Sequence, residues 1–310
     1  MIKIDLVTGF LGAGKTSFIK KYATYLKNQN LHIGIIENDF GAINIDMLLL
    51  QDIENEQCDL EPIVGGNVVS DWKRRFKAKL IFLAMQGIDR VIVEPSGIYD
   101  VDAFFEVLYD DTLNTRFEIG NIFTIIDAKM DERLSEQAEY LLVSQLANSG
   151  QVIVSKTENV PETRIQETIK HLSLLLEKYE CDTNLDGRIF TKIWEEMTLQ
   201  DYEMLMNCGW LRSSYKTMPF DKNEVFSSLF FMHKKIPQDQ LADRINQLIH
   251  DQNCGTIFRV KGFFAGDGDT WTEVNATQEH MEVKEMKHGQ EVVIIIGENL
   301  KEEAITAYFQ

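Results

Sequence analysis

A loop of a type that binds phosphate groups is indicated near the start of the chain. The run is Gly9-Phe10-Leu11-Gly12-Ala13-Gly14-Lys15-Thr16, followed by Ser17, and it has the glycine and Lys-Thr spacing of a phosphate loop. Small residues let backbone N–H groups point at a polyphosphate, and the helix that follows adds partial positive charge. Lys15 can reach the β- and γ-phosphates, and the Thr16 hydroxyl can bind Mg²⁺. The alternative is a plain glycine turn between a strand and a helix, but the complete pattern favours nucleotide binding by Gly9 to Ser17.

Bulk composition narrows the class of protein. The 310 residues are 44% hydrophobic and 26% charged, as expected for one large or two ordinary globular domains. The 49 acidic residues outnumber the 31 basic ones and give a formal charge of -18, which argues against a nucleic-acid partner. Neither a signal peptide nor an apolar run of about 20 residues is evident, so we predict a cytoplasmic protein without a membrane partner. The four cysteines are scattered and predict reduced thiols.

The order of elements predicts two domains. Up to about residue 215, short apolar strands alternate with helices, which is typical of an α/β domain whose mainly parallel sheet is covered on both faces. Strands are predicted at 2–7, 32–37, 90–93, 121–126 and 151–154, and helices at 17–27, 71–85, 135–148 and 162–179. Beyond about residue 215 the pattern becomes that of a small α+β domain with a mainly antiparallel sheet. We place the domains at 1–215 and 222–310.

A second motif follows the predicted strand at 90–93, as Glu94-Pro95-Ser96-Gly97. In a parallel sheet the carboxyl ends of the strands converge on one crevice. A carboxylate there can hold Mg²⁺ or orient the attacking water, and the Gly97 N–H can contact a γ-phosphate. Pro and Gly are also ordinary turn residues, but behind a phosphate loop we favour function. Lys15, Glu94 and Gly97 are therefore the predicted catalytic residues.

Acidic residues end two further strands. Glu37-Asn38-Asp39-Phe40-Gly41 could bring oxygens to Mg²⁺ or simply turn the chain. We predict Thr16, Asp39 and Glu94 as Mg²⁺ ligands with the nucleotide, and Glu37 as a weak one. Asp127 ends the strand at 121–126, where a position near the nucleotide and a helix-capping role stay equally open.

The run Ser155-Lys156-Thr157-Glu158 follows the strand at 151–154. It lies where a P-loop GTPase carries Asn-Lys-x-Asp, whose acid accepts two hydrogen bonds from the guanine edge. Glu158 offers the same acceptors, whereas Ser155 cannot replace every contact of an Asn amide. We predict that Ser155, Lys156 and Glu158 bind the base, and that GTP is preferred over ATP less strictly than in GTPases with the full motif. A plain polar loop is the alternative.

The ordered set of motifs resembles the CobW-type P-loop GTPases over essentially the whole chain. The resemblance rests on GFLGAGKT, ENDFG followed by Ile45-Asp46, EPSG, the run from Ile125 to Ala128, SKTE, and a tail with FRVKGF at 258–263 and Trp271. It implies a nucleotide-dependent metallochaperone or metal-insertion protein. Its client would be a metalloenzyme or a corrinoid-related protein.

One family feature is missing. The family usually carries Gly-Cys-x-Cys-Cys before a helix, but here the corresponding positions are Gly66, Val68 and Val69, which have no soft donor atoms. We therefore expect no thiolate zinc site. Other donors nearby are Glu37, Asp39, Cys58, Asp59 and Glu61, for which a solvated acidic loop is favoured over a metal site.

The function predicted from sequence is slow, Mg²⁺-dependent hydrolysis of GTP, slow because no arginine is evidently placed to act as a finger. A nucleotide-gated binding protein with little hydrolysis and no metal cargo is the alternative. A small-molecule kinase is the third possibility, for which we identify neither an acceptor base nor an arginine-bearing lid.

Overall fold

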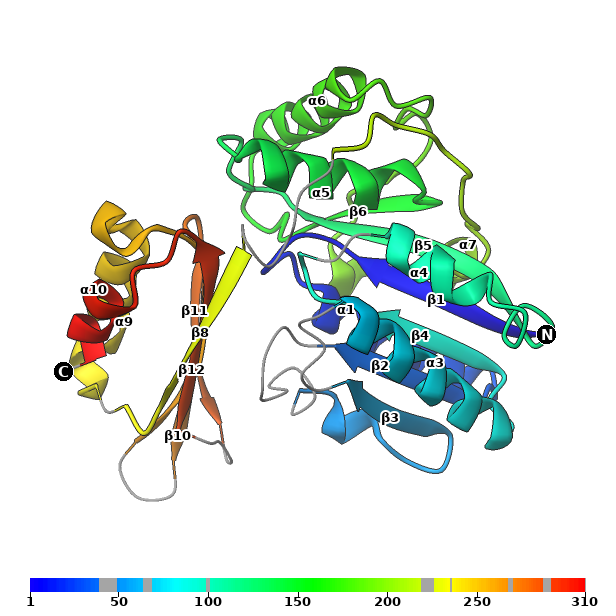
Figure 1. The fold of residues 1–310 in the computed structure, drawn as a ribbon, viewed down its shortest axis with the longest axis horizontal. Helices are drawn as coiled ribbons and strands as arrows, with labels where there is room; N and C mark the ends of the chain where they lie inside the picture. The colour runs from blue at the N-terminus through cyan, green and yellow to red at the C-terminus, as the bar shows by residue number, and fades with distance from the viewer. Residues whose placement is uncertain are drawn as a thin grey trace. The chain divides into compact units, whose positions relative to one another are not determined.

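A computed structural model describes residues 1–38, 49–63, 69–98, 101–218, 226–234, 236–266, 270–286 and 291–309. The chain divides into two compact units, Met1–Pro219 and Phe220–Gln310; Figure 1 labels many of their helices and strands. No helix in these ranges is both long and apolar enough to cross a membrane.

The first unit is built on a seven-stranded sheet in the order β3-β2-β4-β1-β5-β6-β7. Every pairing within it is parallel, so all strands end at the same edge. The strands are β1 (Ile2–Thr8), β2 (Ile33–Asn38), β3 (Cys58–Ile63), β4 (Arg90–Glu94), β5 (Phe117–Asp127), β6 (Gln151–Ser155) and β7 (Ile189–Phe190). Strands β2, β4 and β6 are buried throughout, as expected where helices cover both faces of a parallel sheet.

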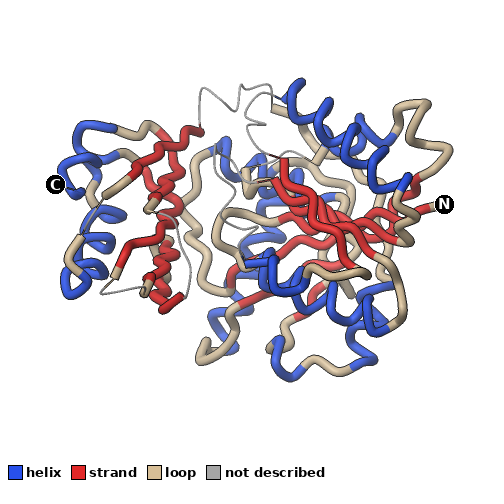
Figure 2. Tube along the Cα trace, turned by 90° about the horizontal axis from the view of Figure 1, so that it is seen from below, coloured by secondary structure: helices blue, strands red, loops and turns tan. Residues whose placement is uncertain are grey.

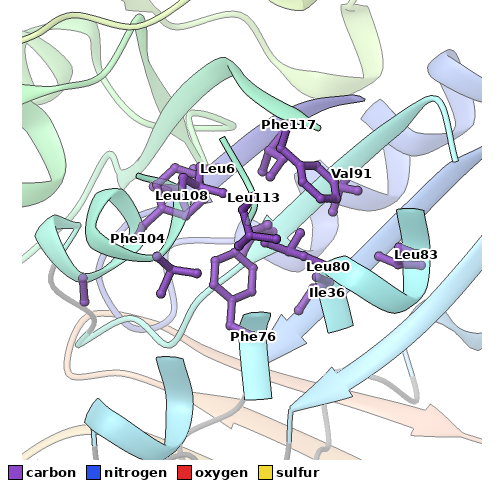
Figure 3. Close-up of a cluster of buried hydrophobic side chains, with 14 of the residues drawn as sticks. Leu6, Ile36, Phe76, Leu80, Leu83, Val91, Phe104, Leu108, Leu113 and Phe117 are labelled. Carbon is purple, nitrogen blue, oxygen red and sulfur yellow. The ribbon is translucent and has the colours of Figure 1, made fainter. Parts of the chain in front are cut away.

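Helices lie on both faces of this sheet (Figure 2). They are α1 (Lys15–Asn28), α3 (Val69–Met85), α4 (Asp102–Leu108), α5 (Glu136–Ala147), α6 (Glu162–Lys178) and α7 (Leu199–Met206), with the 3₁₀ turns η1 (Gln51–Ile53) and η2 (Trp194–Glu196). On one face, Phe76, Leu80 and Leu83 of α3 join Leu6 and Val91 of the sheet in a buried cluster (Figure 3). On the other face, α1 and α7 contribute to a second cluster around β1, β2 and β5.

A buried polar network crosses the face under α1. Asp5, in the middle of β1, is fully buried and accepts hydrogen bonds from Arg90 Nε and Nη2 at 2.5 and 2.8 Å. The Tyr22 hydroxyl of α1 donates to the same carboxylate at 2.8 Å, and so does the Asn121 N–H of β5. The Asn121 side-chain amide donates to the carbonyl of Met206 in α7 at 2.9 Å. Because removing one partner of a buried ion pair costs about 3–5 kcal/mol, this network fixes β1, β4, α1 and α7 to one another.

The second unit is a five-stranded antiparallel sheet in the order β11-β10-β9-β12-β8. Leu241 and Ile245 of α9 pack with Val260, Val274 and Ile295 of the sheet in one apolar cluster. Its elements are β8 (Phe226–Met232), α9 (Gln238–His250), η3 (Gln252–Cys254), β9 (Thr256–Ala265), β10 (Trp271–Ala276), β11 (Met281–Met286), β12 (Val292–Glu298), α10 (Glu302–Thr306) and η4 (Ala307–Phe309).

The predicted fold class is confirmed: a parallel α/β unit is followed by an antiparallel α+β unit. The elements that the sequence analysis missed are β3, α4, β7 and α7. Strand β3 reads CDLEPI, in which two acids and a proline interrupt the apolar pattern, and the other three are between two and eight residues long. Such short segments carry too little periodicity to be recognised.

Candidate nucleotide-binding site

The phosphate loop runs from the end of β1 to the start of α1. Gly9 has a φ of 139°, and a methyl group in place of its hydrogen would lie 2.2 Å from the Ile125 carbonyl oxygen of β5. Only glycine fits this backbone conformation and this close approach. Gly14 occupies the N-cap of α1 with a φ of 98°, so the loop delivers its backbone directly to a helix N-terminus, where anions bind well.

Lys15 is the first residue of α1, and its side chain turns back over the loop. Its Nζ donates to the Gly9 carbonyl at 3.1 Å and contacts the Phe10 carbonyl at 3.4 Å, and the residue is 6% exposed. The ammonium group therefore lies above the same backbone that carries the loop's N–H groups. Contact of Lys15 with the phosphates of a nucleotide stays a prediction.

The structure brings the predicted Mg²⁺ ligands Thr16 and Glu94 together. Thr16 Oγ1 donates to Glu94 Oε1 at 2.9 Å, and Glu94 at the end of β4 is 3% exposed. Glu37 is the parallel register partner of Glu94 on β2 and is 1% exposed. A hydroxyl and two buried carboxylates at one sheet edge form an oxygen-rich position of the kind that Mg²⁺ prefers. Asp39, the remaining predicted ligand, lies outside the described residues.

Gly97 packs directly against the phosphate loop. A methyl group at Gly97 would lie 2.7 Å from the Leu11 nitrogen, so the turn after β4 and the loop after β1 touch through backbone. The buried Gln145 side chain of α5 donates to the Gly97 carbonyl at 3.1 Å. The sequence analysis missed Gln145 because a single glutamine inside an apolar helix belongs to no recognisable motif.

Ser155, the first residue of the predicted base-binding motif, ends β6. Its hydroxyl lies 2.6 Å from the Ala13 carbonyl and 3.1 Å from the Ile126 carbonyl. A hydroxyl carries one proton to donate, and both neighbours here are backbone oxygens. Ser155 therefore ties β6 to the phosphate loop.

The rest of the motif forms the turn after β6. Lys156 adopts a left-handed φ of 55°, and its Nζ lies 2.8 Å from Asp127 Oδ2. Asp127 Oδ1 also accepts the Lys129 N–H at 2.8 Å. Of the two roles left open for Asp127, helix capping is wrong, since the next helix, α5, has Ser135 as its N-cap. Glu158 is exposed on the same turn.

Trp194 is a residue that the sequence analysis missed. Its ring reaches within 3.1 Å of a methyl group placed on Gly14 and lies 6.1 Å, centroid to centroid, from Phe18 of α1. It follows β7, which pairs with β6, and Glu195 beside it pairs with Lys21 of α1 at 2.9 Å. A tryptophan in a short turn has no sequence signature, and tertiary contacts, the pairing of β7 with β6 among them, place it here.

The interpretation of residues 58, 59 and 61 as a solvated acidic loop is wrong, because they belong to β3. Cys58 is fully buried in the α1-side cluster, and burial raises the pKa of its thiol to about 11. Asp59 pairs with His32, and Glu61 with Lys79. Glu37, from the same prediction, is buried on β2. Gly66 and Val68 lie outside the described residues, within which no three His, Cys, Asp or Glu side chains form a group that could hold a metal ion.

Several curated proteins are similar in sequence. The Zinc chaperone YjiA of Escherichia coli is 23% identical over 165 residues, which are 51% of this chain and 50% of that protein. Zinc-regulated GTPase metalloprotein activator 1 of Schizosaccharomyces pombe is 25% identical over 187 residues, 56% of this chain and 44% of that protein. The matches thus span about half the length of these curated relatives.

Among solved structures, Zn(II)-bound YjiA GTPase from E. coli is 18% identical, with a TM-score of 0.44 over 99% of this chain and 98% of that one. HypB from Helicobacter pylori in complex with nickel is 15% identical, with a TM-score of 0.42 over 66% of this chain and 84% of that one.

Two family descriptions match the chain, one for each unit. Residues 227–310 match the cobalamin synthesis protein cobW C-terminal domain. Residues 3–180, which hold the phosphate loop, Glu94 and the turn after β6, match the CobW/HypB/UreG nucleotide-binding domain. The protein therefore belongs to the CobW/HypB/UreG family of nucleotide-binding proteins.

Proposed function

We propose that this protein binds GTP with Mg²⁺, hydrolyses it slowly and assists the insertion of a metal or cofactor into a client protein. The observation that carries the nucleotide part is the contact between Thr16 and Glu94 beside a phosphate loop. A hydroxyl at the start of α1 and a carboxylate at the end of β4 meet at 2.9 Å, which is the pairing needed to hold a nucleotide-bound Mg²⁺.

The hydrolytic step follows from the charges around the loop. The loop N–H groups and Lys15 would stabilise the negative charge that develops on the γ-phosphate. The Gly97 N–H would contact the γ-phosphate from the turn that packs on Leu11. Glu94 would hold Mg²⁺ or orient the attacking water. Slow turnover is expected, because we identify no arginine finger.

Recognition of the base would rest on the turn after β6. The Ser155 hydroxyl contacts backbone oxygens, so the guanine edge would be read mainly by Glu158, with the stem of Lys156 along the base. A site that hydrogen-bonds a specific edge discriminates against a ligand that lacks it. We therefore expect GTP to bind more tightly than ATP, by a smaller margin than with a full Asn-Lys-x-Asp motif.

The metal part of the proposal is supported by the named relatives, a zinc chaperone and a zinc-regulated GTPase metalloprotein activator. The client would be a metalloprotein or a corrinoid-related protein. A second candidate is a nucleotide-gated binding protein without metal cargo. The burial and raised pKa of Cys58 favour it, because a buried, protonated thiol is a poor metal ligand.

The test combines binding with phosphate release. The parent protein, Lys15→Ala and the control Lys20→Ala are assayed with GTP and with ATP in Mg²⁺. Lys20 is on the same helix but exposed, where it pairs with Asp52. We expect only Lys15→Ala to lose tight GTP binding while keeping its fold.

Three outcomes would change the proposal. GTP binding by Lys15→Ala equal to that of the parent would overturn the phosphate-loop assignment. ATP competing as well as GTP would overturn the role of Glu158. Tight GTP binding without phosphate release would favour the nucleotide-gated binding protein.

A further inference from the structure

Asp127 and Lys156 link the ends of two neighbouring strands. Asp127 ends β5 and is the register partner of Ser155, the last residue of β6. Lys156 is the next residue, and its Nζ lies 2.8 Å from Asp127 Oδ2. The side chain of Asp127 is 13% exposed and that of Lys156 is 29% exposed, so this ion pair is shielded more than a typical surface pair.

The carboxylate of Asp127 is itself held in place by its own turn. Its Oδ1 accepts the Lys129 N–H at 2.8 Å, which leaves Oδ2 directed to Lys156. The Ala128 N–H that follows donates to the Ser155 carbonyl at 3.0 Å, and the Thr168 hydroxyl of α6 donates to the Ala128 carbonyl at 2.8 Å. Asp127 is therefore a rigid anchor.

Lys156, by contrast, is a long side chain on a strained backbone. Its φ of 55° is uncommon for a residue other than glycine, and a free lysine loses considerable rotamer entropy when it is immobilised. An anchor at the ammonium end fixes the whole stem before any ligand arrives. Such preorganisation increases affinity by lowering the entropy cost of binding.

We propose that Asp127 is a positioning residue of the nucleobase site, which holds the stem of Lys156 in the orientation that receives the base. This inference rests on the proposed binding of GTP by the turn after β6. It assigns Asp127 a role toward the base and none toward the phosphates, because its carboxylate contacts Lys156 of the base-binding turn and the Lys129 N–H of its own turn. The ion pair thereby contributes to the affinity for the base, whichever purine the nucleotide carries.

The test uses Asp127→Asn, which keeps an oxygen to accept the Lys129 N–H but removes the charge. Affinity is measured for GTP, for ATP and for inorganic tripolyphosphate, which has no base. We expect GTP to bind roughly tenfold more weakly, equivalent to about 1.4 kcal/mol. Tripolyphosphate should bind as it does to the parent, and ATP should lose affinity by a similar factor to GTP, because the Lys156 stem packs on the face of either base.

Asp131→Asn is the matched control. Asp131 also accepts a turn N–H, from Arg133 at 2.9 Å, and also pairs with that basic side chain, but it does not contact the base-binding turn in the described structure. Its replacement should leave all three affinities unchanged. In a Lys156→Met background, Asp127→Asn should have no additional effect on GTP binding, because the residue acts through Lys156.

Unchanged GTP affinity in Asp127→Asn would overturn this inference and leave the proposed function intact. Equal loss of GTP and tripolyphosphate binding would also overturn it, since the damage would then lie in the phosphate site or the fold. If the parent binds neither GTP nor tripolyphosphate, the proposed function fails, and the inference with it.

Discussion

Thr16 Oγ1 donates a hydrogen bond to Glu94 Oε1 at 2.9 Å, although 78 residues separate them in the chain. Glu94→Gln keeps an oxygen that can accept this hydrogen bond but removes the negative charge. We expect Mg²⁺ to bind more weakly, so that hydrolysis needs a higher Mg²⁺ concentration. GTP hydrolysis should also fall by about a hundredfold or more, because metal binding contributes several kcal/mol to such reactions. Phosphate release measured across a Mg²⁺ titration checks this. Glu61→Gln, on β3 and paired with Lys79, is the control, and equal rates in both variants would contradict the role of Glu94.

Gly97→Ala should uncouple the turn after β4 from the phosphate loop. The added methyl would lie 2.7 Å from the Leu11 nitrogen, and because that neighbour is backbone, one of the two segments must move. We expect GTP hydrolysis to fall more than GTP binding, measured by single-turnover assays and equilibrium binding. The control is Gly187→Ala, which strains the backbone at a φ of 70° but places its methyl with nothing within 4 Å, and so shows how much hydrolysis is lost to backbone strain without a clash. Parent-like hydrolysis by Gly97→Ala would rule out a catalytic role for this turn.

Trp194 should report nucleotide binding, because its ring rests on Gly14 at the N-cap of α1. We expect GTP to change the intrinsic tryptophan fluorescence of the parent, and Trp194→Phe to lose most of that change. Trp210→Phe is the control, since Trp210 packs on Phe105. A fluorescence change that persists in Trp194→Phe and disappears in Trp210→Phe would contradict the placement of the indole at the nucleotide.

The Cys58 thiol should make the fold sensitive to alkaline pH. Burial raises its pKa from 9.0 to about 11, so above pH 9 the unfolded state loses this proton before the folded state does. The free energy of unfolding should therefore fall as the pH rises from about 9 to about 11, by about 2–3 kcal/mol for this group. Urea unfolding at a series of pH values checks this against Cys58→Ala, whose decline should be shallower. Parallel curves would show that the thiol ionises equally in both states.

Titration with Co²⁺ tests the absence of a thiolate metal site. Tight Zn²⁺ or Co²⁺ binding by thiolates needs several sulfur donors at one tetrahedral centre, and the family's cysteine positions are taken by Gly66, Val68 and Val69. We expect weak binding through oxygens such as those of Glu37, without a strong cobalt–thiolate band in the near ultraviolet. Such a band at one equivalent, lost in Cys58→Ser, would show that the alignment of this segment is wrong.

Local sequence was sufficient to predict the position of a residue in the fold where that position follows from its neighbours in the chain. The phosphate loop, and Glu94 at the end of an apolar strand, could be predicted because loop chemistry and strand burial leave direct patterns. Asp127 could be placed at a strand end. Its contact with Lys156 could not be predicted, because that contact depends on how β5 pairs with β6. Trp194 and Gln145 could not be predicted, since each reaches the site only through tertiary packing.

The hydrogen-bond network around Asp5 holds helix α1 in place on the sheet. Helix α1 is tied to the sheet at Tyr22 by the Asp5 carboxylate and braced at its start by Trp194 on Gly14. A tilt of α1 would break the hydrogen bond from Tyr22 to the buried Asp5 carboxylate and the packing of Trp194 on Gly14. We therefore expect a change of nucleotide to move the turn at Gly97, which touches the phosphate loop at Leu11, rather than to tilt α1.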